Sequence, residues 1–300
     1  MCDFSRYGGP SREWLAVEAT LPIPSPVSGY HSILERRDAT NERREAQASQ
    51  AMKTLASKVE MHDYSIPTRD GDAIEARSYR SVPHHEQASP VYMHLHGGGF
   101  LFGTLSSEDA TCARIAINTG VVVLDVNYRH TPEFTYPTAW NDAEDAFIWL
   151  HAHIDELRGD SQRIVVGGIS AGGQLSASLV LRKSLGLAAN NLPGIAGQVL
   201  MIPCLVHMDL YERHLARMKD VSISSYFENE NAPILPKSII RMFLDFLKVQ
   251  HLDIDDLMLN PGNASVHQVR GLPPTTFAIA GLDPLRDEGL LYAETLIKAG

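Results

Sequence analysis

The run 168–173 constrains the fold of this chain most, because it reads Gly-Ile-Ser-Ala-Gly-Gly directly after an apolar stretch, 164–166. That stretch predicts a strand buried on both faces, and residues 174–183 have the pattern of a helix. The spacing Gly-x-Ser-x-Gly leaves room for a tight turn from strand to helix, with Ser170 at its apex. There the free N–H groups and the dipole of the helix favour developing negative charge. Ser170 is therefore a candidate nucleophile, although a glycine-rich turn with an incidental serine has the same spacing.

A second glycine-rich loop follows another apolar run, 90–93, where residues 94–100 read His-Leu-His-Gly-Gly-Gly-Phe. Three consecutive glycines let the backbone turn so that its N–H groups point into a cavity, which is the geometry of an oxyanion hole. Taken alone, such a loop also fits a phosphate-binding nest. Its position upstream of the Gly-x-Ser-x-Gly turn, with a predicted strand before each loop, favours the oxyanion hole.

Two further segments carry a family resemblance. Residues 127–133 read Asn-Tyr-Arg-His-Thr-Pro-Glu, and residues 281–289 read Gly-Leu-Asp-Pro-Leu-Arg-Asp-Glu-Gly. Together with the two glycine-rich loops, and in the same order, these segments resemble the hormone-sensitive-lipase-like (HGGG-type) esterase and lipase family of the α/β-hydrolase fold. The resemblance covers about residues 60–300. It implies an α/β fold in which helices flank a mostly parallel central sheet and a helical cap covers the site.

The resemblance implies a role for each motif residue. Ser170 is expected to attack the ester carbonyl, and Asp283 is expected to orient the catalytic imidazole. Ile169 departs from the family pattern, in which an acidic residue is common, but it leaves the nucleophile in place.

The same resemblance assigns the loop residues. The backbone N–H groups of Gly98, Gly99 and Ala171 are expected to form the oxyanion hole. Gly97 is expected to shape the turn, and His96 is expected to brace the loop without taking part in the chemistry.

The sequence has no histidine where this family carries its catalytic base. In α/β-hydrolases the order along the chain is serine, then acid, then histidine. None of the 13 histidines follows Asp283, and the sequence stops at Gly300. The nearest upstream candidates, His251 and His267, are expected to lie on the wrong loop or at the wrong end of the sheet.

Residues 290–300 predict an amphipathic helix with apolar side chains at 290, 291, 296 and 297. The helix ends in Ala-Gly, and such an ending usually introduces a further element. These features predict a truncated or alternatively ended product of a longer esterase, with the last strand and the histidine loop missing. An enzyme that loses a triad member accelerates the reaction only about 10³- to 10⁴-fold over the rate in water. We therefore expect weak esterase activity from these residues alone.

An alternative class keeps the same scaffold without catalysis. The chain also resembles the plant gibberellin receptors, in which the triad histidine is lost and the cap closes over a small molecule. Ser170, Asp283 and the glycine loop do not separate the two classes, because such receptors retain much of that machinery. A strand and a histidine loop beyond residue 300 would favour the hydrolase.

The chain is expected to comprise N-terminal cap helices, 1–57, and a hydrolase core, 58–300, with a cap insertion at about 204–270. The first part has a Pro-rich stretch, 21–26, before a charged helix, 32–58. The insertion is rich in Met, Phe and Leu, and some of these side chains are expected to line an acyl pocket. The expected substrates are therefore small molecules, the short- to medium-chain acyl esters.

Composition excludes several partners. A net charge of −10 and a pI of about 5.7 argue against nucleic-acid binding. No run approaches the ~18 apolar residues of a membrane span, and the N-terminus lacks the apolar core of a signal peptide.

Residues 42–45, Glu-Arg-Arg-Glu, are expected to form a solvated helix face. Cys2, Cys112 and Cys204 are expected to be free thiols, which indicates a cytoplasmic protein.

No cofactor or metal is expected. His84-His85-Glu86 lie in a polar stretch and lack further ligands at metal-binding spacing. The glycines 97–99 do not form the Gly-x-Gly-x-x-Gly pattern of a dinucleotide-binding loop. A homodimer is left open, because the sequence does not decide the oligomeric state.

Overall fold

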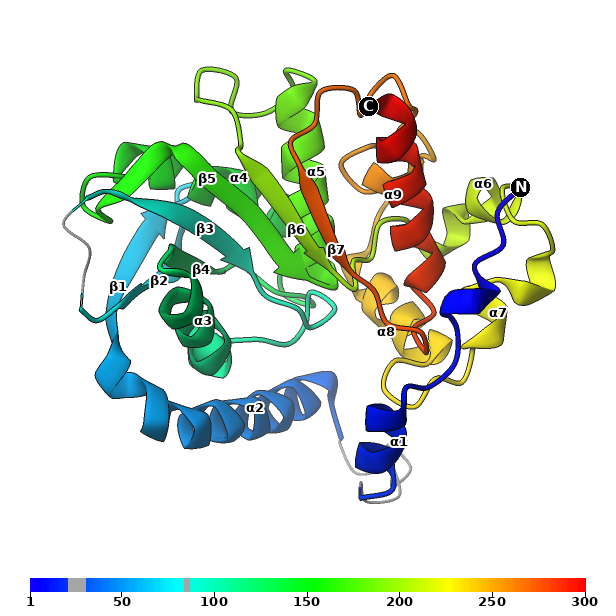
Figure 1. Cartoon of the computed structure of the whole chain (residues 1–300), viewed down its shortest axis with the longest axis horizontal. Coiled ribbons are helices and arrows are strands. Elements are labelled where there is room, and N and C mark those ends of the chain that lie inside the picture. The colour runs from blue at the N-terminus through cyan, green and yellow to red at the C-terminus, as the bar shows by residue number, and fades with distance from the viewer. Residues whose placement is uncertain (21–30, 84–86) are drawn as a thin grey trace.

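The computed structural model describes residues 1–20, 31–83 and 87–300 (Figure 1). The Pro-rich stretch 21–26 and the candidate metal ligands His84, His85 and Glu86 lie outside these residues. The strands are β1 Val59–Pro67, β2 Ala73–Ser81, β3 Ser89–Leu95, β4 Val122–Asn127, β5 Gly159–Ile169, β6 Gly197–Met201 and β7 Thr275–Ala278. The α-helices are α1 Arg12–Glu18, α2 Ile33–Leu55, α3 Leu105–Thr119, α4 Thr138–Ala152, α5 Ala171–Ser184, α6 Glu212–Leu215, α7 Ser225–Glu228, α8 Lys237–Leu247 and α9 Arg286–Ala299.

The seven strands form one twisted sheet in the order β1-β2-β4-β3-β5-β6-β7. β1 and β2 form an antiparallel hairpin, and β2 is also antiparallel to β4. All the other neighbours are parallel. This arrangement confirms the predicted α/β class with a mostly parallel sheet, and the strands predicted at 90–93 and 164–166 lie within β3 and β5.

Helices cover both faces of the sheet, which explains why the central strands are apolar almost throughout. The first five residues of β4 are buried, for example. On one face α3 packs against β2 and β4, and α2 packs on α3 (Figure 1). On the other face α5 packs against β5 and β6, with α4 beside it.

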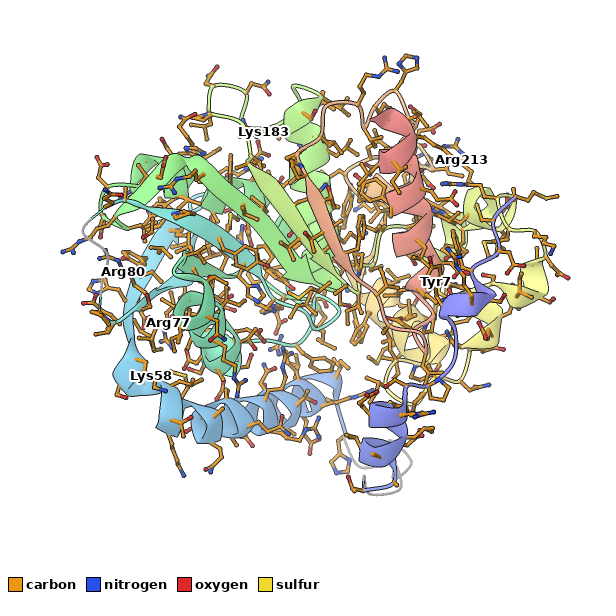
Figure 2. The ribbon with its side chains drawn as sticks, in the orientation of Figure 1. Tyr7, Lys58, Arg77, Arg80, Lys183 and Arg213 are labelled. Atoms are coloured by element: carbon orange, nitrogen blue, oxygen red, sulfur yellow. The ribbon has the colours of Figure 1, made fainter. Side chains whose placement is uncertain are left out.

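An ionic cluster fixes α3 to the hairpin. Arg77 of β2 donates to Asp109 of α3 at 2.8 Å and to Asp63 of β1 at 2.8 Å (Figure 2). Helix α3 itself starts at a capping box formed by Thr104 and Ser107. The loop that precedes α3 is therefore anchored where the helix begins.

Short helices lie between β6 and β7, over part of the predicted insertion. Tyr211, Met218, Tyr226, Leu244 and Leu247 of this segment are buried, whereas Phe227 is 49% exposed. The N-terminal residues pack against it, since the backbone of Cys2 is hydrogen-bonded to residues 217 and 219. The N-terminus and the inserted segment thus lie side by side (Figure 1).

The helix α9 differs from its sequence prediction at one apolar position. Leu291 is fully buried, but Ile297 is 80% exposed. The buried face is formed instead by Glu288, Leu291, Tyr292 and Thr295, which follow the three- and four-residue spacing of a helix. Across the described residues, no helix is both long enough and apolar enough to span a membrane.

Candidate active site

Ser170 stands on the turn between β5 and α5, at φ 55° and ψ −114°. Such a backbone conformation is uncommon for a residue with a side chain. The turn is held by hydrogen bonds, because the N–H of Ser170 donates to Met201 at 2.9 Å and its carbonyl accepts from Gln174 at 3.1 Å. The close approach of β3 explains the flanking glycines, since a Cβ at Gly168 or at Gly172 would overlap the carbonyl of Leu95.

The loop after β3 has a backbone that only glycine adopts readily. Gly98 has φ 142° and Gly99 has φ 62°. The carbonyl of Gly98 accepts from Leu101 at 3.1 Å and from Phe102 at 3.0 Å, which closes the turn. Among the described residues, no hydrogen bond uses the N–H group of Gly98 or of Gly99. Both N–H groups therefore lack a hydrogen-bond partner among the described residues, on a loop that lines the adjacent cavity.

His96 lies beneath this loop and is fully buried. Its ring stacks on Tyr128, with the centroids 4.4 Å apart, and its Nδ1 is 3.2 Å from the carbonyl oxygen of Gly97. Burial lowers the pKa of His96 to about 4, so the ring is neutral near pH 7. These contacts are those of a structural support for the loop.

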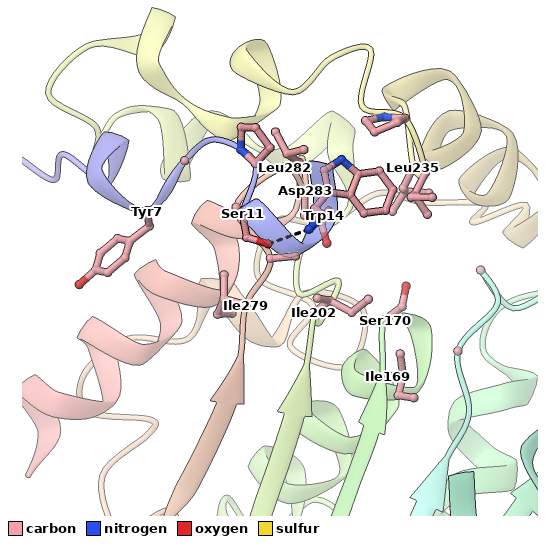
Figure 3. A pocket seen from close by; sticks show the side chains of 18 of the residues that line it. Tyr7, Ser11, Trp14, Ile169, Ser170, Ile202, Leu235, Ile279, Leu282 and Asp283 are labelled. Carbon is pink, nitrogen blue, oxygen red and sulfur yellow. Dashed lines mark hydrogen bonds between the residues drawn. The ribbon is translucent and has the colours of Figure 1, made fainter. Parts of the chain in front are cut away.

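Asp283 follows β7 and is 8% exposed. Burial raises the pKa of its carboxyl group to about 6, although the N–H of Leu285 donates to Oδ1 at 2.9 Å and opposes the rise. Asn229 of the inserted segment donates to the backbone carbonyl of Asp283 at 3.1 Å and so holds the loop. In Figure 3 Ser170 and Asp283 lie on the walls of the same pocket.

That pocket is a cavity of about 900 Å³ at the carboxyl ends of β3, β5, β6 and β7. Ligands in open α/β sheets bind at this end of the strands. Ser170, Asp283 and Gly97 to Gly99 all line it, whereas Ala171 and His96 are buried outside its surface. The apolar part of the lining comprises Pro10, Trp14, Ile169, Ile202, Pro233, Ile234, Leu235, Phe243, Ile279, Ala280 and Leu282.

No histidine lines this cavity within the described part of the chain. His251 and His267 are exposed, and His267 precedes β7, at the opposite end of that strand from Asp283. The sequence prediction that neither histidine reaches Ser170 agrees with these positions.

Two parts of the site were not identified from the sequence. Arg44 lies in the charged run 42–45, which was predicted to be a solvated face, but it lines the cavity. Both of its Nη atoms lie 3.3 Å from the carbonyl oxygen of Gly97, and one is 2.7 Å from Glu108. The prediction is therefore wrong for Arg44, because α2 turns this residue toward the loop. Only Glu42 and Arg43 of the run are exposed.

Phe243 of α8 is the second such residue. A Cβ at Gly99 would overlap its ring, so the ring lies directly on the glycine loop. Phe102 meets the same ring edge-on, with the centroids 5.7 Å apart. The sequence indicated that some Phe or Met of the insertion lines a pocket, but it carried no signal that selects Phe243.

The cavity lining offers Asp283 as its only carboxylate, and no group of metal ligands is found there among the described residues. The three cysteines are free, as predicted. A cluster of three buried candidate ligands, His94, Cys112 and Asp125, lies outside the cavity, beneath α3.

The fold and this cavity define an α/β-hydrolase, and comparison with known proteins agrees. The model of a family described as "alpha/beta hydrolase fold" matches residues 92–300. The chain belongs to this family, within the hormone-sensitive-lipase-like branch. It is similar to the carboxylesterase NlhH of Mycobacterium tuberculosis, with 37% identity over 217 residues that cover 70% of this chain. The chain spans only 61% of the length of that relative.

Solved structures show the same similarity over more of the chain. Vibralactone cyclase superposes with a TM-score of 0.85 at 26% identity, covering 100% of this chain and 85% of that protein. A bacterial heroin esterase superposes with a TM-score of 0.76 at 29% identity, covering 95% of this chain and 84% of that protein.

Proposed function

We propose that this chain carries the site of a carboxylic ester hydrolase that forms an acyl-enzyme on Ser170. The observation that carries the proposal is the sharing of one cavity by Ser170, the free N–H groups of Gly98 and Gly99, and Asp283. The similarity to proteins named as carboxylesterases supports the same class of reaction.

In the proposed reaction, Oγ of Ser170 attacks the ester carbonyl carbon and passes its proton to solvent water. The carbonyl oxygen becomes an oxyanion, which the N–H groups of Gly98, Gly99 and Ala171 stabilise. Collapse of this intermediate breaks the bond to the alkoxide, which takes a proton from water and leaves as the alcohol, and an acyl group remains on Ser170. Water then attacks the acyl group, which releases the acid and restores the serine hydroxyl.

The proton on Ser170 needs a base, and no histidine of the described residues lines the cavity. Asp283 alone is a poor substitute, because a carboxylate in this position orients an imidazole and does not itself take the proton. We therefore propose that this chain by itself is a weak esterase. Its expected acceleration is on the order of 10³ to 10⁴ over water, from the oxyanion hole and substrate binding.

The apolar lining suits a short or medium acyl chain. Trp14, Leu235 and Phe243 are large apolar residues of the lining, and they come from the N-terminal segment and the insertion. We propose that these two parts form the cap, as the sequence predicts for 1–57 and about 204–270.

Labelling with a fluorophosphonate tests the nucleophile. Slow labelling is expected, located at Ser170 by peptide mass spectrometry and absent from Ser170→Ala. Ser178→Ala is a matched control on the same helix, because Ser178 is buried and does not line the cavity. Labelling at another residue, with Ser170 left unmodified, would contradict the proposal.

A second candidate function is binding without turnover. The observation that favours it is the combination of a 900 Å³ cavity, mostly apolar, with no histidine in its lining among the residues described. A chain of this kind would bind an apolar small molecule and show no difference between wild type and Ser170→Ala in ester turnover.

A further inference from the structure

Three potential metal ligands meet beneath α3, on the side of the sheet opposite α5. His94 of β3 and Asp125 of β4 are directly paired in the parallel ladder, so both side chains lie on the same face. Cys112 of α3 lies over them, and all three residues are fully buried. One ligand atom of each residue lies within 4.8 Å of the other two.

The polar atoms of this cluster lack the partners that buried groups normally have. Nδ1 of His94 and both carboxylate oxygens of Asp125 have no hydrogen-bond partner of ordinary geometry among the described residues, although the backbone N–H of Val126 lies near the Asp125 carboxylate. Leaving a buried donor or acceptor unpaired is costly, and few such groups occur in folded proteins. Here three such atoms belong to the paired side chains of His94 and Asp125. We infer that a binding partner belongs between these two side chains.

The other side of the His94 ring is already occupied. Its Nε2 lies 3.4 Å from Glu108, and Glu108 is held at 2.7 Å by Arg44. A carboxylate on one ring nitrogen fixes the tautomer and leaves the other nitrogen as a lone-pair donor, as in the carboxylate–histidine–metal arrangement. Nδ1 of His94 is thus prepared to bind a cation.

We propose that His94, Cys112 and Asp125 bind a zinc ion. Zinc accepts imidazole nitrogen, thiolate sulfur and carboxylate oxygen as ligands. Ligand atoms around tetrahedral zinc are roughly 3.5 Å apart, so the cluster needs to contract by about 1 Å at its widest separation. An aspartate and a thiolate together cancel the two charges of the ion.

The charge balance supports a cation at this place. The carboxylates of Glu108 and Asp109 lie beside the buried Asp125 and Cys112. Arg77, a cation near Asp125, is already paired with Asp63 and Asp109. A divalent cation would stabilise both the carboxylate and the thiolate.

The position suggests a structural role. His94 lies two residues before His96, on the strand that leads into the glycine loop, whereas Cys112 lies on the helix that follows the loop. Zinc at this point would fasten the two ends of the loop to each other. This proposal does not depend on the proposed ester hydrolysis.

Zinc content tests the proposal directly. The full chain, produced in zinc-supplemented cells, is expected to retain about one zinc per chain by plasma mass spectrometry. Cys112→Ala and Asp125→Asn are expected to lose at least tenfold in zinc affinity, while Cys204→Ala, the loss of another buried thiol, keeps the full content. Cobalt substituted for zinc is expected to give a thiolate charge-transfer absorption that Cys112→Ala lacks.

The competing explanation is a neutral, protonated Asp125 in a core that holds no metal. It predicts that Asp125→Asn folds as stably as wild type and that wild type carries only traces of zinc. If either substitution prevents folding, wild type alone still decides: a strong chelator should lower its melting temperature. Zinc content well below one per chain, or a melting temperature that the chelator does not change, would overturn the proposal.

Discussion

Arg44 of α2 donates to the carbonyl oxygen of Gly97 from both of its Nη atoms, each at 3.3 Å. The same guanidinium pairs with Glu108, whose side chain is only 6% exposed. A residue of the N-terminal part thereby holds the carbonyl that begins the glycine loop.

This contact predicts a loss of stability when Arg44 is replaced. Arg44→Ala leaves the buried Glu108 without its charged partner, so the free energy of unfolding should fall by about 1–3 kcal/mol. The exposed Arg43 is a matched control, and Arg43→Ala should stay within about 0.5 kcal/mol of wild type. Urea denaturation measures both values, and equal effects of the two substitutions would contradict the role of Arg44.

Asp283 predicts a dependence of stability on pH. Its pKa is raised to about 6 in the folded chain and returns to its ordinary value of 3.8 on unfolding. Between these values the folded state holds a proton that the unfolded chain releases, so this contribution to stability declines as the pH rises through the window.

Asp283→Asn removes that titration and leaves an oxygen to accept from Leu285. Above pH ~6 the variant should be more stable than wild type by up to about 3 kcal/mol, and the gain should vanish below pH ~4. Thermal denaturation across this range measures the difference. A gain that does not change with pH would show that the carboxyl group is not the cause.

The position of Phe243 predicts which acyl chain lengths the cavity accepts. Because its ring lies on Gly99, Phe243→Ala should lengthen the pocket beside the glycine loop. Labelling of Ser170 by alkyl fluorophosphonates should then shift to longer chains, with a gain of up to roughly fourfold for each methylene that is newly buried. Phe227→Ala, at a position 49% exposed, should leave the preference unchanged. The same shift in both variants would exclude a specific role for Phe243.

The backbone conformation of Gly98 predicts that a side chain at this position disturbs the glycine loop. Its φ of 142° is unfavourable for alanine, and the new Cβ would overlap the carbonyl of Phe102. Gly98→Ala should therefore lower stability by at least about 1–3 kcal/mol and abolish labelling of Ser170. Gly194→Ala is the control, because its Cβ would meet no neighbour within 4 Å. Retained labelling in Gly98→Ala would contradict the proposed oxyanion hole.

The local parts of the site could be predicted from the sequence. The strand, turn and helix around Ser170 follow from a continuous apolar run and closely spaced glycines, and the structure has β5 and α5 there. The loop of Gly97 to Gly99 was found for the same reason, because glycine patterns report backbone geometry within a few residues.

The distant contacts could not be predicted in this way. Arg44 was assigned to solvent because its neighbours in sequence are charged, and only the packing of α2 on α3 brings it to Glu108. His94, Cys112 and Asp125 are far apart in the sequence and meet only through strand register and helix packing. No local pattern reports such a meeting.

The central claim is that Ser170 is the nucleophile of an ester hydrolase whose cavity lacks a base among the described residues. Turnover of p-nitrophenyl butyrate, measured with and without added imidazole for wild type and Ser170→Ala, tests it most directly. We predict slow turnover by wild type that imidazole increases, and no increase for Ser170→Ala beyond the reaction in buffer. A fast wild-type rate without imidazole, or equal rates for the two proteins, would contradict the account.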